Sequence, residues 1–169
     1  LVSGPVNIEP FLGIDVVNVK SAADMAEAVA ARSEASDIVV MCSAVADYTP
    51  THYSAQKVKK SDGELSIPLA RTTDILHTLG MKKKEGQMLV GFSMETENLI
   101  ENSRKKLSKK NADIICANTI ADGGATGFAV DTNQVTLITE TEVITLPLCT
   151  KEETADLILS HIVELQKEK

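Results

Sequence analysis

Residues 37–42 read DIVVMC: one acidic residue is followed by four apolar residues and a cysteine. Runs of the same kind stand at 88–92 (MLVGF) and 113–117 (DIICA), and segments with helical periodicity lie between them. Short apolar runs without polar alternation are typical of strands buried on both faces of a parallel sheet, because crossover helices cover each side. They predict an α/β fold: a three-layer, mostly parallel, Rossmann-like sheet with helices on both faces.

The segments around these runs predict the remaining elements. Two helix starts carry a capping box, in which a hydroxyl and a carboxylate three residues later satisfy each other's backbone N–H: Ser21 with Asp24, and Thr150 with Glu153. Gly80 follows a short helix and is expected to end it. Further strands are expected at 14–19 and 64–70, further helices at 72–79 and 95–110, and a late β-hairpin from 134–139 and 143–146.

Composition sets the class of protein. The chain has 169 residues, 43% of them hydrophobic and 24% charged, which predicts a single globular domain over 1–169. The net charge of −7 argues against a nucleic-acid binder and against a membrane-surface protein, and no apolar stretch approaches 18 residues. Three cysteines without CxxC spacing indicate a reducing, cytoplasmic setting, and the histidines show no metal-ligand spacing.

Charge is distributed unevenly along the chain. Between Lys57 and Lys110 lie 12 of the 17 basic residues but 7 of the 24 acidic ones. A basic middle in an acidic protein favours one anionic ligand over a polyanion. The alternative is that these lysines are solvated loop and helix faces.

Polar residues at strand ends are the natural candidates for a binding site, because ligands of parallel α/β sheets lie outside the carboxyl ends of the strands. Three segments qualify: 43–48, 93–95 and 118–125. Asp47 is suited to hold a ribose, a base donor or Mg²⁺, or simply to cap a turn. Phe92 is suited to stack on a base or to fill the core. Asn118 offers a donor and an acceptor, to a ligand or to its own loop.

Cationic residues supply a second set of candidates. In KVKK at 57–60, Lys57 and Lys59 are expected on one side of an extended segment. They would either bind phosphates or be solvated lysines that keep an edge strand from pairing with another chain. Lys106 and Lys110 share a helix face, where they serve either phosphates or the helix C-terminus. Thr72, Thr73 and Asp74 open a helix whose free N–H groups suit an anion, although plain capping explains them as well.

The order of the motifs is more specific than any one of them. The succession SGP, SAVADY, KVKK, TTDIL, VGFSMET, KKLSKKNADIICAN and TGFAVDTNQVTLI resembles the phosphopantothenoylcysteine synthetase family, in its bacterial CTP-using form. The resemblance implies an acid–amino-acid ligase of coenzyme A synthesis. Phosphopantothenate would attack CTP to give an acyl-cytidylate and pyrophosphate, and L-cysteine would then displace CMP.

The resemblance also implies which residues act. Lys57 would be the catalytic cation, Asn118 would position substrate or its own loop, and Mg²⁺ would be held through the CTP phosphates rather than by a direct ligand motif. The CTP contacts would fall on Ser43, Ala44, Asp47, Lys57, Thr73, Asp74, Ile75, Leu76, Phe92, Lys106 and Lys110. Ser43 and the Thr72-Thr73 pair depart from the usual family residues without removing a charge.

The resemblance further implies a homodimer, to which the late hairpin would contribute, and a flavin-dependent decarboxylase domain fused or associated. The family begins with a strand, a Gly-rich turn and a helix, and this β-loop-α unit is missing ahead of Leu1, so the domain is expected to be N-terminally incomplete. Two other classes stay open: a nicotinamide- or flavin-dependent oxidoreductase, although no GxGxxG occurs, and a non-catalytic dimerisation module.

Overall fold

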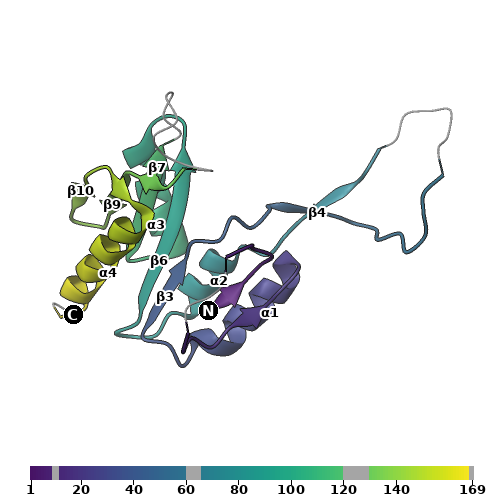
Figure 1. Ribbon diagram of the computed structural model, residues 1–169, viewed down its shortest axis with the longest axis horizontal. Helices are drawn as coiled ribbons and strands as arrows, with labels where there is room; N and C mark the ends of the chain where they lie inside the picture. Colours follow the sequence, from purple (N-terminus) through teal and green to yellow (C-terminus); the bar gives the residue numbers. More distant parts are fainter. Residues whose placement is uncertain (9–11, 60–65, 120–129, 168–169) are drawn as a thin grey trace. The chain divides into compact units, whose positions relative to one another are not determined.

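The computed structural model describes residues 1–8, 12–59, 66–119 and 130–167 (Figure 1). The chain divides into two compact units that interleave along the sequence. The first comprises Leu1–Val29 and Ala44–Asp74, and the second Ala30–Ser43 and Ile75–Lys169. The two are described in turn.

The first unit contains two small sheets. β1 (Val2–Ser3) and β2 (Val17–Asn18) are parallel, and β4 (Tyr48–Pro50) and β5 (Leu69–Arg71) are antiparallel. Both β2 and β5 are shorter than the strands expected at 14–19 and 64–70, and 60–65 lie outside the described residues.

Helix α1 (Ala22–Ser33) begins in the first unit, at the capping box that the sequence predicts. The Asp24 N–H donates to Ser21 Oγ at 3.1 Å, and the Ser21 N–H donates to Asp24 Oδ2 at 3.0 Å. The first orphan N–H groups of the helix are therefore satisfied locally.

The second unit is built on a five-stranded sheet of order β10-β9-β7-β6-β3 (Figure 1). The three predicted apolar runs form its parallel part: β3 (Ile38–Met41), β6 (Met88–Glu95) and β7 (Ile114–Thr119). The predicted hairpin, β9 (Val135–Ile138) and β10 (Val143–Thr145), adds antiparallel to β7. The sheet is therefore mixed rather than mostly parallel. A further pair, β8 (Thr132–Asn133) and β11 (Cys149–Thr150), is antiparallel.

Helices cover both faces of this sheet, as predicted. On one face, α4 (Lys151–Lys167) packs Ile158 and Ile162 against alternate residues of β6, β7 and β9, Val90 and Cys116 among them. On the other face, α3 (Leu99–Lys110) packs Leu107 against the opposite set, which includes Ile115. The predicted Thr150–Glu153 capping box starts α4, with bonds of 2.9 and 3.2 Å.

Three helix boundaries differ from the prediction. The first is the start of α2 (Ile75–Lys82), which was expected at residue 72 and lies at Ile75. The second is the end of α2, which continues through Gly80 instead of ending there. Gly80 serves close packing instead, since it lies against the backbone carbonyl of Lys110. α3 begins at Leu99 rather than at residue 95, because Met94 and Glu95 continue β6 in register with β7. Asn98, in the left-handed conformation at φ 50°, turns the chain from the strand into the helix.

Candidate functional site at the strand ends

The register of β6 and β7 assigns the candidate residues to faces of the sheet. Phe92 pairs with Cys116, and Met94 with Asn118. Because Cys116 packs against α4, Phe92, Met94 and Asn118 lie on the α4 face. The alternate residues of β6, including Glu95, lie on the α3 face.

At the carboxyl end of β6 and β7, the α4 face carries two exposed apolar side chains and one buried polar side chain. Phe92 is 37% exposed, although it follows four buried residues, and Met94 is similarly exposed. Asn118 is 8% exposed, and its Oδ1 has no hydrogen-bond partner among the described residues. A buried acceptor without a partner costs free energy, so Asn118 is suited to a ligand donor. The structure thus brings two predicted site residues, Phe92 and Asn118, to one end of one face.

The α3 face ends in a charged network. Lys106 Nζ donates to Glu95 Oε1 at 2.6 Å, and Asn102 Nδ2 donates to Glu95 Oε2 at 3.3 Å. Lys110 lies one turn beyond Lys106 and is half-buried. The prediction named both lysines. It included Glu95 in the candidate segment 93–95 but gave it no role and placed it at the start of a helix.

Ile75 and Leu76 place their side chains in the core. Ile75 is buried, and Leu76 packs beside Leu107 and Ile115. A β-carbon at Gly91 would lie 2.5 Å from Leu76 Cδ2, so the glycine of VGF makes room for this leucine. Because their side chains are packed in the core, Ile75 and Leu76 could contact a ligand only through their backbone groups.

The remaining candidates, apart from exposed Ser43, belong to the first unit. The Asp47 carbonyl accepts from the Thr72 N–H at 2.9 Å, and Thr72 Oγ1 donates to the Ala46 carbonyl at 2.6 Å. These bonds join the SAVADY loop to the segment that precedes α2. Ala44, Asp47, Lys57, Lys59, Thr73 and Asp74 are exposed.

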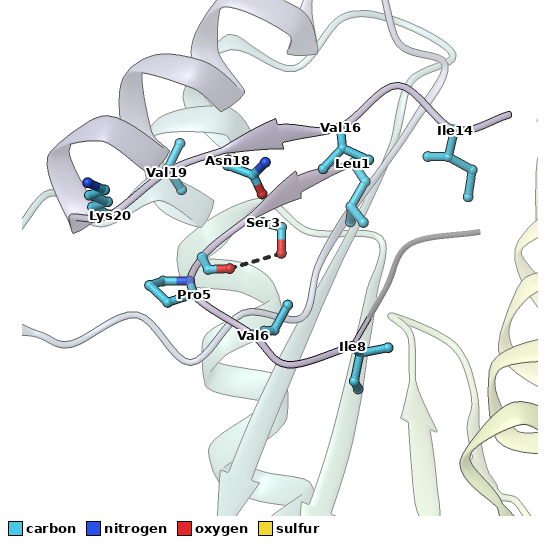
Figure 2. Close-up of a pocket in the computed structure, with 11 residues that line it drawn as sticks. Leu1, Ser3, Pro5, Val6, Ile8, Ile14, Val16, Asn18, Val19 and Lys20 are labelled. Carbon is cyan, nitrogen blue, oxygen red and sulfur yellow. Dashed lines mark hydrogen bonds between the residues drawn. The ribbon is translucent and has the colours of Figure 1, made fainter. Parts of the chain in front are cut away.

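The first unit also contains a cavity of about 440 Å³ that the sequence analysis did not anticipate (Figure 2). β1, β2 and the chain after β1 line this open pocket, and most of its lining is aliphatic, including Leu1, Val6 and Val16. The predicted nucleotide contacts do not line it. The SGP motif, which contributes Ser3 and Gly4, was the sequence signal closest to it; Ser3 Oγ donates to the Gly4 carbonyl at 3.1 Å.

The cysteines differ in burial. Cys116 is buried, which raises the pKa of its thiol to about 12, whereas Cys42 is exposed despite its place in an apolar run. No group of three or more His, Cys, Asp or Glu residues in the described ranges is placed to hold a metal ion. Within the same ranges, no helix has both the length and the apolarity needed to cross a bilayer.

Comparison with known proteins connects this arrangement to a family. The family of "DNA/pantothenate metabolism flavoprotein C-terminal domain" matches residues 1–165. The bifunctional coenzyme A biosynthesis protein CoaBC of Bacillus subtilis (strain 168) is 45% identical over 170 residues, which cover 99% of this chain and 41% of that protein. A cysteine/cysteine sulfinic acid decarboxylase of an unknown prokaryotic organism is 42% identical over 167 residues, which cover 98% of this chain and 46% of that protein.

A solved structure gives the same result for the fold. The crystal structure of the C-terminal domain of a CoaBC protein has a TM-score of 0.81 and 40% identity, over 99% of this chain and 74% of that chain. The chain spans less than half the length of the two relatives compared above. The predicted family is confirmed: the chain belongs to the DNA/pantothenate metabolism flavoprotein C-terminal domains, and it shares its fold with the C-terminal domain of CoaBC.

Proposed function

We propose that the chain is a phosphopantothenoylcysteine synthetase domain that joins phosphopantothenate to L-cysteine at the expense of CTP. The observation that carries the proposal is the 40% identity, over nearly the whole chain, with the C-terminal domain of a CoaBC protein. The α/β sheet with polar residues beyond its parallel strands supports it, because this is where such sheets bind nucleotides.

In this proposal the reaction has two steps. The carboxylate oxygen of phosphopantothenate attacks the α-phosphorus of CTP, the P–O bond to the β-phosphate breaks, and pyrophosphate leaves. The cysteine amine then attacks the acyl carbon, the bond to CMP breaks, and the amine loses a proton as the amide forms. Both steps build negative charge that a fixed cation stabilises.

The described residues fit the roles that the resemblance implies. Phe92 presents an exposed ring to a base, and Asn118 presents a buried acceptor that has no partner in the described part of the chain. Lys106 and Lys110 would meet phosphates, and exposed Lys57 would stabilise the transition states. Asp47 would contact the nucleoside, Ser43 and Ala44 would contribute backbone groups, and Thr73, Asp74, Ile75 and Leu76 would offer the N–H groups at the start of α2.

Mg²⁺ would be held by the phosphate oxygens of CTP and would neutralise their charge. A homodimer and a decarboxylase partner, fused or associated, complete the proposal.

The test is substrate-dependent release of pyrophosphate by the full-length protein. We expect release that requires CTP, Mg²⁺ and phosphopantothenate, and amide product that requires L-cysteine in addition. Thermal shifts with CTP, ATP, NAD and FMN form the second arm, since a ligand that binds the folded state raises its melting temperature. Stabilisation by NAD with no CTP-dependent turnover would favour the oxidoreductase instead.

A further inference from the structure

The carboxylate of Glu95 is held between two side chains of α3, although Glu95 belongs to the end of β6. We propose that Glu95 is a positioning residue, which holds the Lys106 ammonium ready for a phosphate group of the nucleotide. The inference rests on the proposed function, because it takes Lys106 as a phosphate ligand.

Both carboxylate oxygens of Glu95 are occupied. Oε1 accepts from Lys106 Nζ at 2.6 Å, and Oε2 accepts from Asn102 Nδ2 at 3.3 Å. Asn102 Nδ2 also donates to the Glu97 carbonyl at 3.1 Å, in the turn that joins β6 to α3. The carboxylate is therefore fixed by its strand, by the following turn and by the helix.

Exposure separates the two ends of the ion pair. The Glu95 side chain is 12% exposed, whereas that of Lys106 is 43% exposed. An ammonium group has three N–H donors, and Glu95 takes one of them. The other two have no partner among the described residues, and the exposure of the Lys106 side chain makes it the end of the pair that an anion can approach without displacing Glu95.

Holding a lysine in advance has a measurable effect on binding. A free lysine loses rotamer freedom when it binds an anion, and each immobilised long side chain costs about 0.5–1.5 kcal/mol. Glu95 has already restricted Lys106 in the folded chain, so the nucleotide does not bear that cost. Since 1.4 kcal/mol corresponds to a tenfold change in Kd, losing Glu95 is expected to raise the Kd for the nucleotide about 2- to 10-fold.

The same helix provides a matched control. Lys105 donates to Glu101 at 2.7 Å, four residues apart, but both side chains are more than 60% exposed. An exposed pair of this kind contributes little, because water and salt screen it. Glu101→Ala thus removes one carboxylate and one ion pair from α3 without touching Lys106.

The experiment compares Glu95→Ala, Glu95→Gln and Glu101→Ala in the full-length protein. We expect Glu95→Ala to raise the KM for CTP about 2- to 10-fold while kcat changes less than twofold. Glu95→Gln keeps an acceptor for Lys106 and should fall between Glu95→Ala and wild type, and Glu101→Ala should match wild type. Thermal unfolding is measured for each, and KM is compared at a temperature where all are folded.

A double-mutant cycle with Lys106→Met separates positioning from a structural role. If Glu95 acts through Lys106, then Glu95→Ala has no further effect on the KM for CTP once Lys106 is methionine. An unchanged KM in Glu95→Ala, or an equal increase with and without Lys106, would overturn the inference. Wild-type protein without CTP-dependent turnover would instead overturn the proposed function.

Discussion

Gly80 lies against the carbonyl oxygen of Lys110, and a β-carbon built at position 80 would overlap that oxygen. Two helices, α2 and α3, thereby approach each other backbone to backbone. Asn111 Nδ2 donates to the Gly80 carbonyl at 2.8 Å, and His77 Nδ1 lies 3.0 Å from the Lys109 carbonyl, so polar contacts reinforce the approach. A glycine inside a helix, which costs about 1 kcal/mol relative to alanine, is retained here for space.

Gly80→Ala is therefore expected to destabilise the protein despite the better helix propensity of alanine. The neighbouring atom is backbone, so α2 and α3 must separate, and overpacking of this kind costs about 1–3 kcal/mol. Urea unfolding measures the change. Gly4→Ala is the control, because a β-carbon there meets none of the described residues within 4 Å. A Gly80→Ala protein as stable as wild type would show that the helices separate freely.

Lys57→Gln should impair chemistry more than CTP binding and leave the fold intact. Lys57 is exposed and irregular in structure, so its loss costs little stability. Losing one cation that stabilises transition-state charge typically costs about 10²–10³ in rate. Single-turnover kinetics would follow acyl-cytidylate formation and cysteine capture separately. Lys59→Gln is the control, and small, equal effects would show that KVKK is a solvated segment.

The two capping boxes give stability a pH dependence. A hydrogen bond from the Ser21 side chain lowers the pKa of Asp24 below its ordinary 3.8, and one from the Thr150 backbone lowers the pKa of Glu153 below 4.5. Groups with lowered pKa values stabilise the fold above their unfolded pKa, and this contribution is lost as pH falls through the folded value. We expect the Asp24→Asn/Glu153→Gln protein to lose less stability than wild type between about pH 5 and pH 3.

Chemical unfolding at several pH values measures this difference. Glu164→Gln, on α4 but away from its capping box, is the control and should leave the pH dependence as in wild type. Parallel stability curves for the double variant and wild type would show that the boxes contribute no linkage.

The cysteines should differ in reactivity. Cys42 is exposed, whereas burial raises the pKa of the Cys116 thiol to about 12 and leaves almost no thiolate at pH 8. We expect a disulfide reagent to modify Cys42 rapidly and Cys116 at the rate of unfolding. Mass spectrometry of the labelled peptides assigns each site. Rapid labelling of Cys116 in folded protein would contradict its burial.

β10 is an edge strand of the five-stranded sheet, and Val143 and Ile144 on it are exposed. Such an edge is suited to pair with another copy of itself. We expect a homodimer by light scattering, and Ile144→Lys should shift it towards monomer without lowering the stability of the monomer. A monomeric wild type at micromolar concentration would contradict the predicted assembly.

Local signals in the sequence predicted the parts of the fold that depend on neighbours in the chain. The capping boxes at Ser21 and Thr150 join residues three positions apart. The apolar composition of the central strands likewise indicates directly that they are buried. Gly80 was misread as a helix end because its partner, Lys110, is 30 residues away. The mixed character of the sheet likewise follows from how β9 pairs with β7, which no local pattern specifies.

The same reasoning applies to the site. Phe92 and Asn118 were predicted from the rule that ligands bind beyond strand ends, and the structure places both on one face. Glu95 lay in the candidate segment 93–95, but its contact with Lys106 was not predicted, because Lys106 is 11 residues away on a helix that begins later than expected. Of the loop expected at 118–125, residues 120–125 lie outside the described residues, so its role stays a prediction.

The interleaving of the two units has a consequence for synthesis on the ribosome. The chain leaves the second unit at Ser43 and returns at Ile75, so β3 emerges well before the strand it pairs with. Ile38 pairs with Met88, 50 residues later, which at about 5–20 residues per second is a delay of several seconds. During that interval the IVVM segment has no sheet to join. The nascent chain therefore exposes its most apolar early strand, and chaperones that bind such segments would act on it first.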